Sequence, residues 1–358
     1  MNDTSKATTP PARARTKVRD LTPTEWRVPE MPERLLLDLR TDCNLKCPKC
    51  LLHGDGVDGE RKHQMIGTMD ADNARRILDE VMAAKPLIQP SWWGEPLLAR
   101  NLEGHIRDMK ERSIAVCMNT NGLTLTEKLA RFFVDVRLDA IFFSLDATKP
   151  ETLLKTRGID KLDKIVKNLR MMLRIRGDGI YPRIGATLTV EPANQDEVEE
   201  FVARWTPVVD VVRIGLVYAN GSLKGLPPEQ GPRKPCALLY QTMPIHYNGD
   251  VSICCFDSLG DHLVGNVFKD GGVRAVWHGK ELTRLRRLHE SGRFDEIPFC
   301  KNCNAWAGYM FEEEVRDGLL IRRSPQFVYY NRIDRLGSWH DNLRGHRPPP
   351  RELLEKVE

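Results

Sequence analysis

With 358 residues, the chain is long enough for one large domain with a sizeable buried core and a second, smaller domain. It has 41% hydrophobic residues, 29% charged residues and a net charge of +4, a balance that indicates neither a nucleic-acid nor a membrane partner. No stretch approaches the roughly 20 apolar residues of a membrane span. The basic N-terminus has no apolar run behind it, which excludes a secretory signal. We therefore expect a cytoplasmic protein.

The predicted elements begin after residues 1–30, which are rich in Pro, Thr and Arg, lack periodicity and are expected to form a flexible tail. Short apolar runs then alternate with amphipathic ones. Strands are expected at 33–40, 87–93, 114–120, 138–147, 183–190 and 209–217, and helices at 70–84, 101–113, 124–135, 160–176 and 194–205. This alternation predicts an α/β fold, a partial (β/α)6 barrel of the TIM type with its chemistry at the C-terminal strand ends.

A Gly- and Pro-rich stretch at residues 221–235 predicts a domain boundary after this barrel. Beyond the boundary we expect a hairpin at 243–255, with its turn at Asn248 and Gly249, and a helix around 273–290. The predicted domains are the core barrel at 31–220, a small α+β domain at 221–335 and a polar C-terminal tail at 336–358.

Nine cysteines need an explanation other than disulfides, which are rare in the cytoplasm. Cys43, Cys47 and Cys50 directly follow the first strand. Three thiolates at this spacing can ligate three irons of a cubane and leave the fourth iron open to a small molecule, whereas a ferredoxin cluster has four thiolates. The alternative is a structural zinc site with His53 as the fourth ligand.

The run CNLKCPKC at 43–50 resembles the cluster loop of the radical S-adenosylmethionine (SAM) superfamily. Four further motifs follow in the family's order at strand ends: WGEP at 93–96, NTNG at 119–122, FSLDA at 143–147 and KTRG at 155–158. Together the five motifs make the resemblance specific, and it covers about residues 33–217. Two positions depart from the family, because Lys49 replaces a usual aromatic residue and Trp93 replaces the first glycine of the second motif.

The resemblance implies that the first three cysteines hold a [4Fe–4S] cluster, with SAM bound at its open iron. It also implies that Gly94 and Glu95 take the SAM ammonium, that Arg157 pairs with the SAM carboxylate and that Ser144 contacts SAM near its ribose or carboxylate. Reductive cleavage of SAM would give a 5′-deoxyadenosyl radical that abstracts a substrate hydrogen, with flavodoxin or ferredoxin as electron donor. Taken singly, each residue has a less favoured alternative: a surface ion pair for Arg157, and a helix cap or a core hydroxyl for Ser144.

A second set of cysteines lies in the last third of the chain: Cys236, Cys254, Cys300 and Cys303. Their spacing, with Gly249 at the intervening turn, resembles the twitch domain, which is the reduced form of the SPASM domain. This resemblance implies a second [4Fe–4S] cluster that is fully ligated and suited to electron transfer. A structural zinc is the alternative.

Cys117 and Cys255 are left over. Cys255 neighbours a ligand on an expected strand, so its side chain should point the other way. Either thiol is a buried free cysteine or a hydrogen-atom donor, as in radical SAM epimerases. Arg213, Tyr218 and Asn220 at the last strand end are candidates for the pocket wall or for ordinary rim residues.

The expected reaction is dehydrogenation of a small molecule, a sugar or an aminocyclitol, with the second cluster as electron acceptor. The first alternative is epimerisation of a sugar through a cysteine hydrogen donor. The second is modification of a ribosomal peptide, which is less favoured because only about 30 residues precede the barrel. A non-enzymatic iron–sulfur or zinc-binding protein would require the SAM motifs to be coincidental.

Overall fold

The computed structural model describes residues 17–20, 26–219, 221–226 and 231–338. The strands are β1 (Lys17–Asp20), β2 (Arg34–Leu37), β3 (Leu87–Gln89), β4 (Ala115–Thr120), β5 (Ala140–Ser144), β6 (Arg183–Val190), β7 (Val211–Leu216), β8 (Tyr218–Ala219), β9 (Ser222–Leu223), β10 (Thr242–Ile245), β11 (Asp250–Ser252), β12 (Leu263–Asn266), β13 (Met310–Arg316), β14 (Leu319–Arg323) and β15 (Phe327–Arg332). The α-helices are α1 (Gly59–Gln64), α2 (Ala71–Val81), α3 (Leu102–Glu111), α4 (Glu127–Asp135), α5 (Pro150–Arg157), α6 (Leu162–Arg176), α7 (Val198–Trp205), α8 (Val273–Trp277) and α9 (Lys280–Glu290). None of these helices is long and apolar enough to cross a membrane.

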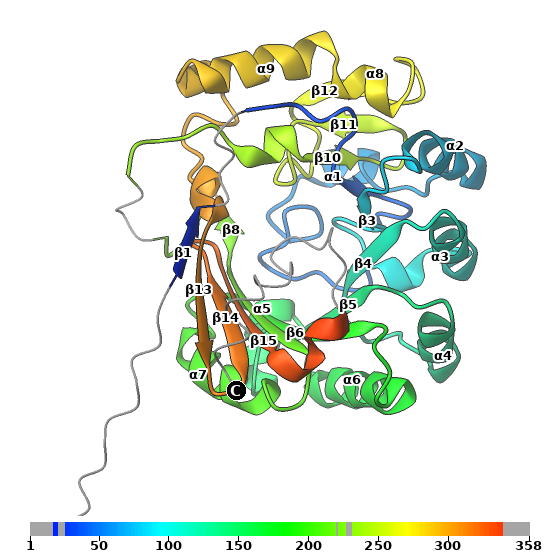
Figure 1. The fold of residues 1–358 in the computed structure, drawn as a ribbon, viewed down its shortest axis with the longest axis vertical. Coiled ribbons are helices and arrows are strands. Elements are labelled where there is room, and N and C mark those ends of the chain that lie inside the picture. The colour runs from blue at the N-terminus through cyan, green and yellow to red at the C-terminus, as the bar shows by residue number, and fades with distance from the viewer. Residues whose placement is uncertain (1–16, 21–25, 220, 227–230, 339–358) are drawn as a thin grey trace, which may run out of the picture.

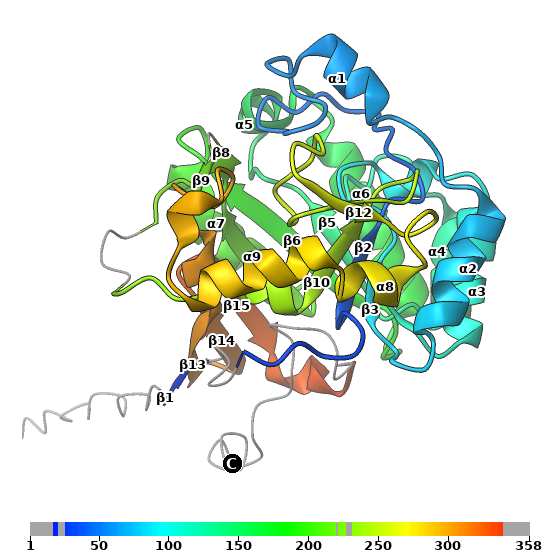
Figure 2. The same cartoon turned by 90° about the horizontal axis from the view of Figure 1, so that it is seen from above.

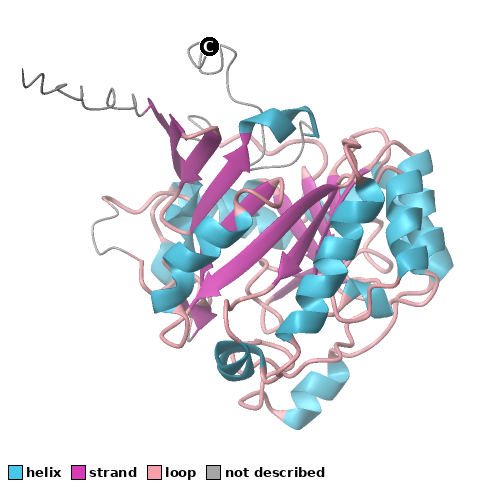
Figure 3. Cartoon of the chain, turned by 90° about the horizontal axis from the view of Figure 1, so that it is seen from below, coloured by secondary structure: helices cyan, strands magenta, loops and turns pink. Residues whose placement is uncertain are grey.

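Strands β2 to β7 form the expected parallel sheet, lie in sequence order and pair in parallel throughout. Helices α2, α3, α4, α6 and α7 surround the outer face of this curved sheet (Figure 1). The strands lie inside this ring of helices when the molecule is seen from below (Figure 3). The sheet does not close, so the α/β class and the partial barrel are confirmed.

The period of two along the strands divides the buried residues between two faces of the sheet. Leu35 and Leu37 of β2 pack outward with Ile77 and Leu78 of α2 in the main core. A smaller apolar cluster fills part of the inner face: Leu87, Ala115, Cys117, Ala140, Phe142, Val211 and Tyr329. The polar residues that follow these strands are therefore left to line the space above the inner cluster.

Both edges of the parallel sheet carry further strands that the sequence did not place there. On one edge β10 pairs in parallel with β2 and continues to β11 and β12. On the other, β15 pairs antiparallel with β7 and is followed by β14, β13 and β1. One sheet therefore runs from the expected small domain through the barrel, with α8 and α9 lying over β10 to β12 (Figure 2).

The second half of the chain confirms one local expectation and corrects another. β10 and β11 form the predicted hairpin, and Gly249 at its turn has φ of +87°, a conformation that favours glycine. The single helix expected at 273–290 is instead two helices, because the chain leaves the helical path at His278 and Gly279.

The expected tails fall largely on residues 1–16, 21–25 and 339–358, which lie outside the described residues. Lys17–Asp20, however, forms β1 beside β13. The Trp26 ring packs at a tilt of 46° against that of Tyr240, with ring centroids 4.8 Å apart, and the Trp277 indole donates to the Pro29 carbonyl at 2.9 Å. This part of the expected flexible tail packs against the fold instead.

Candidate active site at the strand ends

The C-terminal ends of the parallel strands converge on a cavity of about 350 Å³. Each of the seven residues predicted for the first cluster and SAM lies in its wall: Cys43, Cys47, Cys50, Gly94, Glu95, Ser144 and Arg157. These residues come from the segments after β2, β3 and β5 and from the ends of β5 and α5. The parallel sheet thus brings together motifs that are more than 100 residues apart in the chain.

The loop that carries the first three cysteines is held by its own backbone. The Cys50 N–H donates to the Cys47 carbonyl at 2.9 Å. Two further N–H groups point at sulfur, from Leu45 to Cys43 Sγ at 3.4 Å and from His53 to Cys50 Sγ at 3.2 Å. His53, the candidate fourth zinc ligand, is buried and its Nε2 is hydrogen-bonded to the Thr41 carbonyl at 2.8 Å.

Burial keeps the thiols of Cys43 and Cys47 protonated when no metal is bound. Burial, together with the charges of Glu95, Cys47 and Cys50 and against a hydrogen bond from the Leu45 N–H, raises the pKa of Cys43 to about 12. Burial also raises the pKa of Cys47, against which Arg157 acts. A bound metal ion favours the thiolate over the thiol, so a cysteine that ligates it is deprotonated in spite of burial. The three residues therefore fit an iron–sulfur cluster.

Gly94 and Glu95 join the cavity to the base of the cluster loop. A Cβ at Gly94 would lie 2.4 Å from the Arg40 carbonyl oxygen, so only glycine permits this approach. The Glu95 N–H donates to the Asp42 carbonyl at 2.9 Å. The Glu95 carboxylate accepts from Thr120 Oγ1 at 2.6 Å and from the Asn121 N–H at 2.8 Å.

Glu95 is 3% exposed, and burial raises its pKa against the opposing effect of these hydrogen bonds. Its Oε1 also accepts from the Leu97 N–H at 3.1 Å, whereas Oε2 accepts only from Asn121 and keeps one lone pair for a further donor. The buried position and the remaining capacity suit recognition of a ligand's ammonium group.

Asp146, which follows β5, organises the opposite wall. Its Oδ2 lies 2.9 Å from Arg157 Nε and 2.9 Å from Lys49 Nζ, and its Oδ1 accepts from the Thr189 N–H at 2.7 Å. Burial raises the pKa of Asp146, but the charges of Lys49 and Arg157 outweigh burial and hold the pKa well below its usual value. Lys49 also pairs with Glu191 at 2.9 Å.

The Asp146 contacts explain one departure from the family's cluster loop. Where the family usually has an aromatic residue, the Lys49 ammonium joins the cluster loop to the carboxylates of Asp146 and Glu191. Arg157 forms an ion pair, as the alternative interpretation expected, but a half-buried one in the cavity wall. Only its Nε is engaged among the described residues, so its two terminal nitrogens suit a carboxylate ligand.

The second set of cysteines also comes together. Cys236 precedes a 3-10 helix at Ala237–Tyr240, Cys254 follows β11, and Cys300 and Cys303 share one turn in which the Cys303 N–H donates to the Cys300 carbonyl at 3.0 Å. Burial raises the pKa of all four thiols.

Neighbouring thiols add to this effect: Cys303 and Cys300 raise the pKa of Cys236, and Cys303 and Cys236 raise that of Cys254. Four buried thiols that oppose one another's ionisation fit a cationic cluster as their common partner. Among the described residues, no three His, Cys, Asp or Glu side chains are arranged to hold a single metal ion.

Cys117 and Cys255 lie inside the barrel region but do not line the cavity. Cys117 belongs to the inner apolar cluster and is 8% exposed. Cys255 lies in a turn beyond β11 instead of on the expected strand, and its carbonyl accepts from Trp92 Nε1 at 2.8 Å. The strand alternation invoked for its orientation therefore does not apply.

The far wall of the cavity is formed by Tyr218, a candidate from the sequence, and by residues that the sequence did not indicate. Tyr218 and Phe256 stack with ring centroids 4.0 Å apart and an interplanar angle of 14°, and both line the cavity. Gln326 and Phe327 reach it from β15 and the turn before it. No local signal marks these two residues, because pairing with β7 alone places them there. Asn220 lies outside the described residues.

Two family models match the chain. The model described as the radical SAM superfamily matches residues 40–204, and the SPASM model, described as an iron–sulfur cluster-binding domain, matches residues 236–304. Curated relatives include the tungsten-containing aldehyde ferredoxin oxidoreductase cofactor-modifying protein of Pyrococcus furiosus, 25% identical over 46% of this chain and 46% of the relative. A probable GTP 3′,8-cyclase of Pyrococcus abyssi is 26% identical over 47% of this chain and 51% of the relative. The matches thus span about half the length of these relatives.

Solved structures share the fold at low sequence identity. The chain matches anSMEcpe with bound AdoMet and Cp18Cys peptide at a TM-score of 0.55 and 15% identity, covering 78% of this chain and 90% of that one. It matches BtrN in complex with AdoMet and 2-DOIA at 0.50 and 16%, covering 76% and 93%. It matches Streptococcus suis SuiB with precursor peptide SuiA at 0.53 and 15%, covering 71% and 66%. The chain therefore carries a radical SAM domain over residues 40–204 and a SPASM iron–sulfur cluster-binding domain over residues 236–304.

Proposed function

We propose that this radical SAM enzyme dehydrogenates a secondary alcohol of a sugar or an aminocyclitol, with the group held by the second cysteine set as electron acceptor. The supporting observation is the wall formed by Tyr218 and Phe256. Phe256 is two residues from Cys254, and its N–H points at Cys254 Sγ at 3.5 Å. Burial raises the pKa of Tyr218, and the charges of Cys303, Cys254, Cys255 and Cys300 add to the rise. The aromatic pair therefore faces the cavity on one side and the second cysteine set on the other.

The two domains imply a [4Fe–4S] cluster in the barrel, an auxiliary cluster and SAM. When bound, these groups supply an electron that cleaves SAM to methionine and a 5′-deoxyadenosyl radical, removal of one substrate hydrogen atom, and an acceptor for the second substrate electron. The protein's own residues bind and orient. In this proposal Glu95 accepts from the SAM ammonium and the terminal nitrogens of Arg157 donate to its carboxylate. Tyr218 and Phe256 exclude water from the reacting face.

The test uses the reconstituted holoenzyme with SAM and a panel of sugars and aminocyclitols under anaerobic conditions. We expect one two-electron-oxidised ketone for each 5′-deoxyadenosine, measured by mass spectrometry and chromatography. A double Cys300→Ala, Cys303→Ala variant should still form 5′-deoxyadenosine, while ketone formation falls at least tenfold. A wild-type product of unchanged oxidation state would refute dehydrogenation.

Epimerisation is the second candidate, with Cys117, which is buried beneath the cavity, or Cys255, which is half-buried, as the hydrogen donor. Burial raises the pKa of Cys117 to about 11 and that of Cys255 to about 12, so both remain S–H groups at neutral pH and can donate a hydrogen atom. In deuterium oxide an epimerase would place deuterium in its product. Because neither thiol lines the cavity, the donor has to move toward the substrate, and Cys117→Ala or Cys255→Ala should abolish the transfer. Full epimerisation by both variants would contradict a thiol donor.

A further inference from the structure

Two arginines from opposite edges of the six-stranded parallel sheet project into its interior. Arg34 lies on β2 and Arg213 on β7, the first and last strands of that sheet. Their sequence neighbours Leu35 and Val212 are buried in the outer core, so the alternation of side chains directs both arginines inward. The curvature of the sheet brings the two edges to one interior.

Both guanidinium groups bind the amide residues that form the floor of the cavity. An Arg34 terminal nitrogen donates to Gln89 Oε1 at 2.6 Å, and one from Arg213 donates to Asn119 Oδ1 at 3.1 Å. Gln89 and Asn119 both line the cavity. Because each amide oxygen is directed at a guanidinium, each amide presents its NH₂ end elsewhere. Gln89 Nε2 donates to the Ser91 carbonyl at 3.0 Å, and Asn119 Nδ2 has no partner among the described residues.

Arg213 is further held by aromatic rings. Its guanidinium carbon lies 5.1 Å from the Phe142 ring centroid and 5.9 Å from that of Phe327, a cavity residue. Such contacts fix the orientation of a guanidinium without neutralising its charge. The positive charge beneath the cavity therefore persists.

Neither arginine forms an ion pair with a carboxylate in the part of the chain that the structure describes. Other arginines of the barrel do, as Arg157 with Asp146 at 2.9 Å shows. Arg34 Nε is moreover buried with no hydrogen-bond partner among the described residues. Both arginine side chains are half-buried, so their charges are only partly hydrated and have no carboxylate to balance them, and an anion bound above them would stabilise them.

The two charges act on a common region. Burial raises the pKa of Cys117, and the positive charges of Arg34 and Arg213 both oppose that rise. The same two charges oppose the effect of burial on the pKa of Tyr329. The floor therefore combines two convergent guanidinium charges with an outward-facing amide donor on Asn119.

We propose that the substrate carries an anionic group, a carboxylate or a phosphate, that binds on this floor at Asn119, above the charges of Arg213 and Arg34, which lie behind the cavity lining. The inference rests on the proposed function for the reaction and names its substrate class. It selects acidic sugars, phosphorylated or uronic, over aminocyclitols, because the same charges repel an ammonium group. Guanidinium groups are well matched to either anion.

The experiment measures binding of four probes to the reconstituted holoenzyme with SAM by isothermal titration calorimetry: glucose 6-phosphate, glucuronate, glucose and glucosamine. We expect at least one acid to bind tenfold or more tightly than glucose, and glucosamine to bind more weakly than glucose. The two acids distinguish a phosphate from a carboxylate site. Arg213→Gln and Arg34→Gln should each remove the preference for the acid while iron content and SAM affinity stay unchanged. Arg131→Gln, at an exposed position on α4, is the matched control and should behave as wild type.

Acids that bind no more tightly than glucose to the wild type would overturn the proposal. So would an acid preference that survives in both Gln variants, or a loss of SAM affinity in them, which would assign the arginines to SAM. Product analysis of the same samples separates the two proposals. An acid that binds through the arginines but yields no oxidised product contradicts dehydrogenation and leaves the anion site standing.

Discussion

At the scale of single residues, the departure of Lys49 from the family pattern has a defined structural consequence. Its ammonium bridges Asp146 and Glu191, each at 2.9 Å, and so ties the cluster loop to the segments after β5 and β6. Asp146 also holds Arg157. The Asp146 carboxylate therefore holds the cluster loop through Lys49 and also orients Arg157, the residue proposed to bind SAM.

Replacing Lys49→Met should remove both ion pairs and leave Asp146 with Arg157 alone. We expect a loss of about 1–3 kcal/mol in the free energy of unfolding, the range for removing a partner from a largely buried charged group, and weaker SAM binding. Urea unfolding and equilibrium dialysis of the anaerobic holoprotein measure the two quantities. Lys155→Met, an exposed lysine on α5, is the control and should change neither. Equal effects of the two substitutions would contradict a role for the Lys49 pairs.

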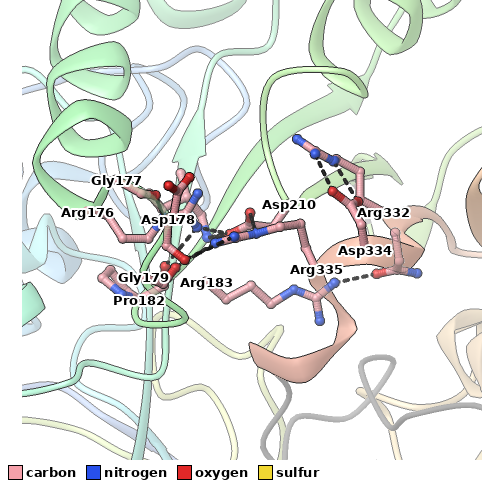
Figure 4. A network of polar contacts seen from close by, with 12 residues as sticks. Arg176, Gly177, Asp178, Gly179, Pro182, Arg183, Asp210, Arg332, Asp334 and Arg335 are labelled. Carbon is pink, nitrogen blue, oxygen red and sulfur yellow. Dashed lines mark hydrogen bonds and ion pairs between the residues drawn. The ribbon is translucent and has the colours of Figure 1, made fainter.

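At the scale of elements, the strands β13 to β15 are fastened to the barrel by more than their backbone pairing. Asp210, fully buried before β7, accepts from the Ile184 N–H at 2.7 Å and pairs with Arg176 at the end of α6. It also pairs with Arg335 at 3.0 Å, in the 3-10 helix (Ile333–Ser338) that follows β15 (Figure 4). This carboxylate links three segments that are distant in sequence.

Asp210→Asn should therefore destabilise the protein by about 3 kcal/mol, because it removes the negative charge from two arginines in a largely buried network. The control is Asp334→Asn, which breaks an exposed pair with Arg332 (Figure 4) and should cost less than about 1 kcal/mol. Urea unfolding of both variants checks the difference. A loss at Asp334 as large as that at Asp210 would show that burial of the network is not what stabilises it.

At the scale of the whole molecule, the two cysteine sets belong to one continuous sheet. The first cluster loop follows β2, and β2 pairs in parallel with β10, whose hairpin partner β11 leads to Cys254. The sheet therefore fixes the position of the second set relative to the barrel cavity. No cysteine is shared between the two sets, so we expect the two sites to be ligated independently.

Iron analysis tests this independence. We expect about eight irons in the reconstituted wild type and about four both in a Cys43/Cys47/Cys50→Ala variant and in a Cys300/Cys303→Ala variant, as two cubanes predict. Electron paramagnetic resonance of the reduced variants should show two different cluster signals. About four irons in the wild type and none in the triple variant would mean that the second set holds zinc or nothing, and the electron-acceptor proposal would fail.

Local periodicity and motif order in the sequence determined the barrel. The six strands and their helices were predicted to within a few residues, since a helix face or a strand face is encoded in neighbouring positions. Asp70, the first residue of the helix predicted at 70–84, is the N-cap of α2 and accepts from the Asp72 N–H at 2.9 Å. The seven cavity residues were named from the resemblance of the motifs to the family, and they meet in one cavity because parallel strands end at one edge of the sheet.

The tertiary structure alone decided what pairs with the edges of the barrel and what lies beneath its cavity. Pairing of β15 with β7 joins Phe327 to Gly215, more than 100 residues away, and no local pattern encodes a contact at that separation. The same long-range packing places Arg34 beside Gln89 and Arg213 beside Asn119. The sequence by itself therefore determined the cofactor chemistry, which depends on compact motifs. The proposed substrate floor was decided by folding, because Arg34 and Arg213 come together only when the opposite edges of the parallel sheet curve toward each other.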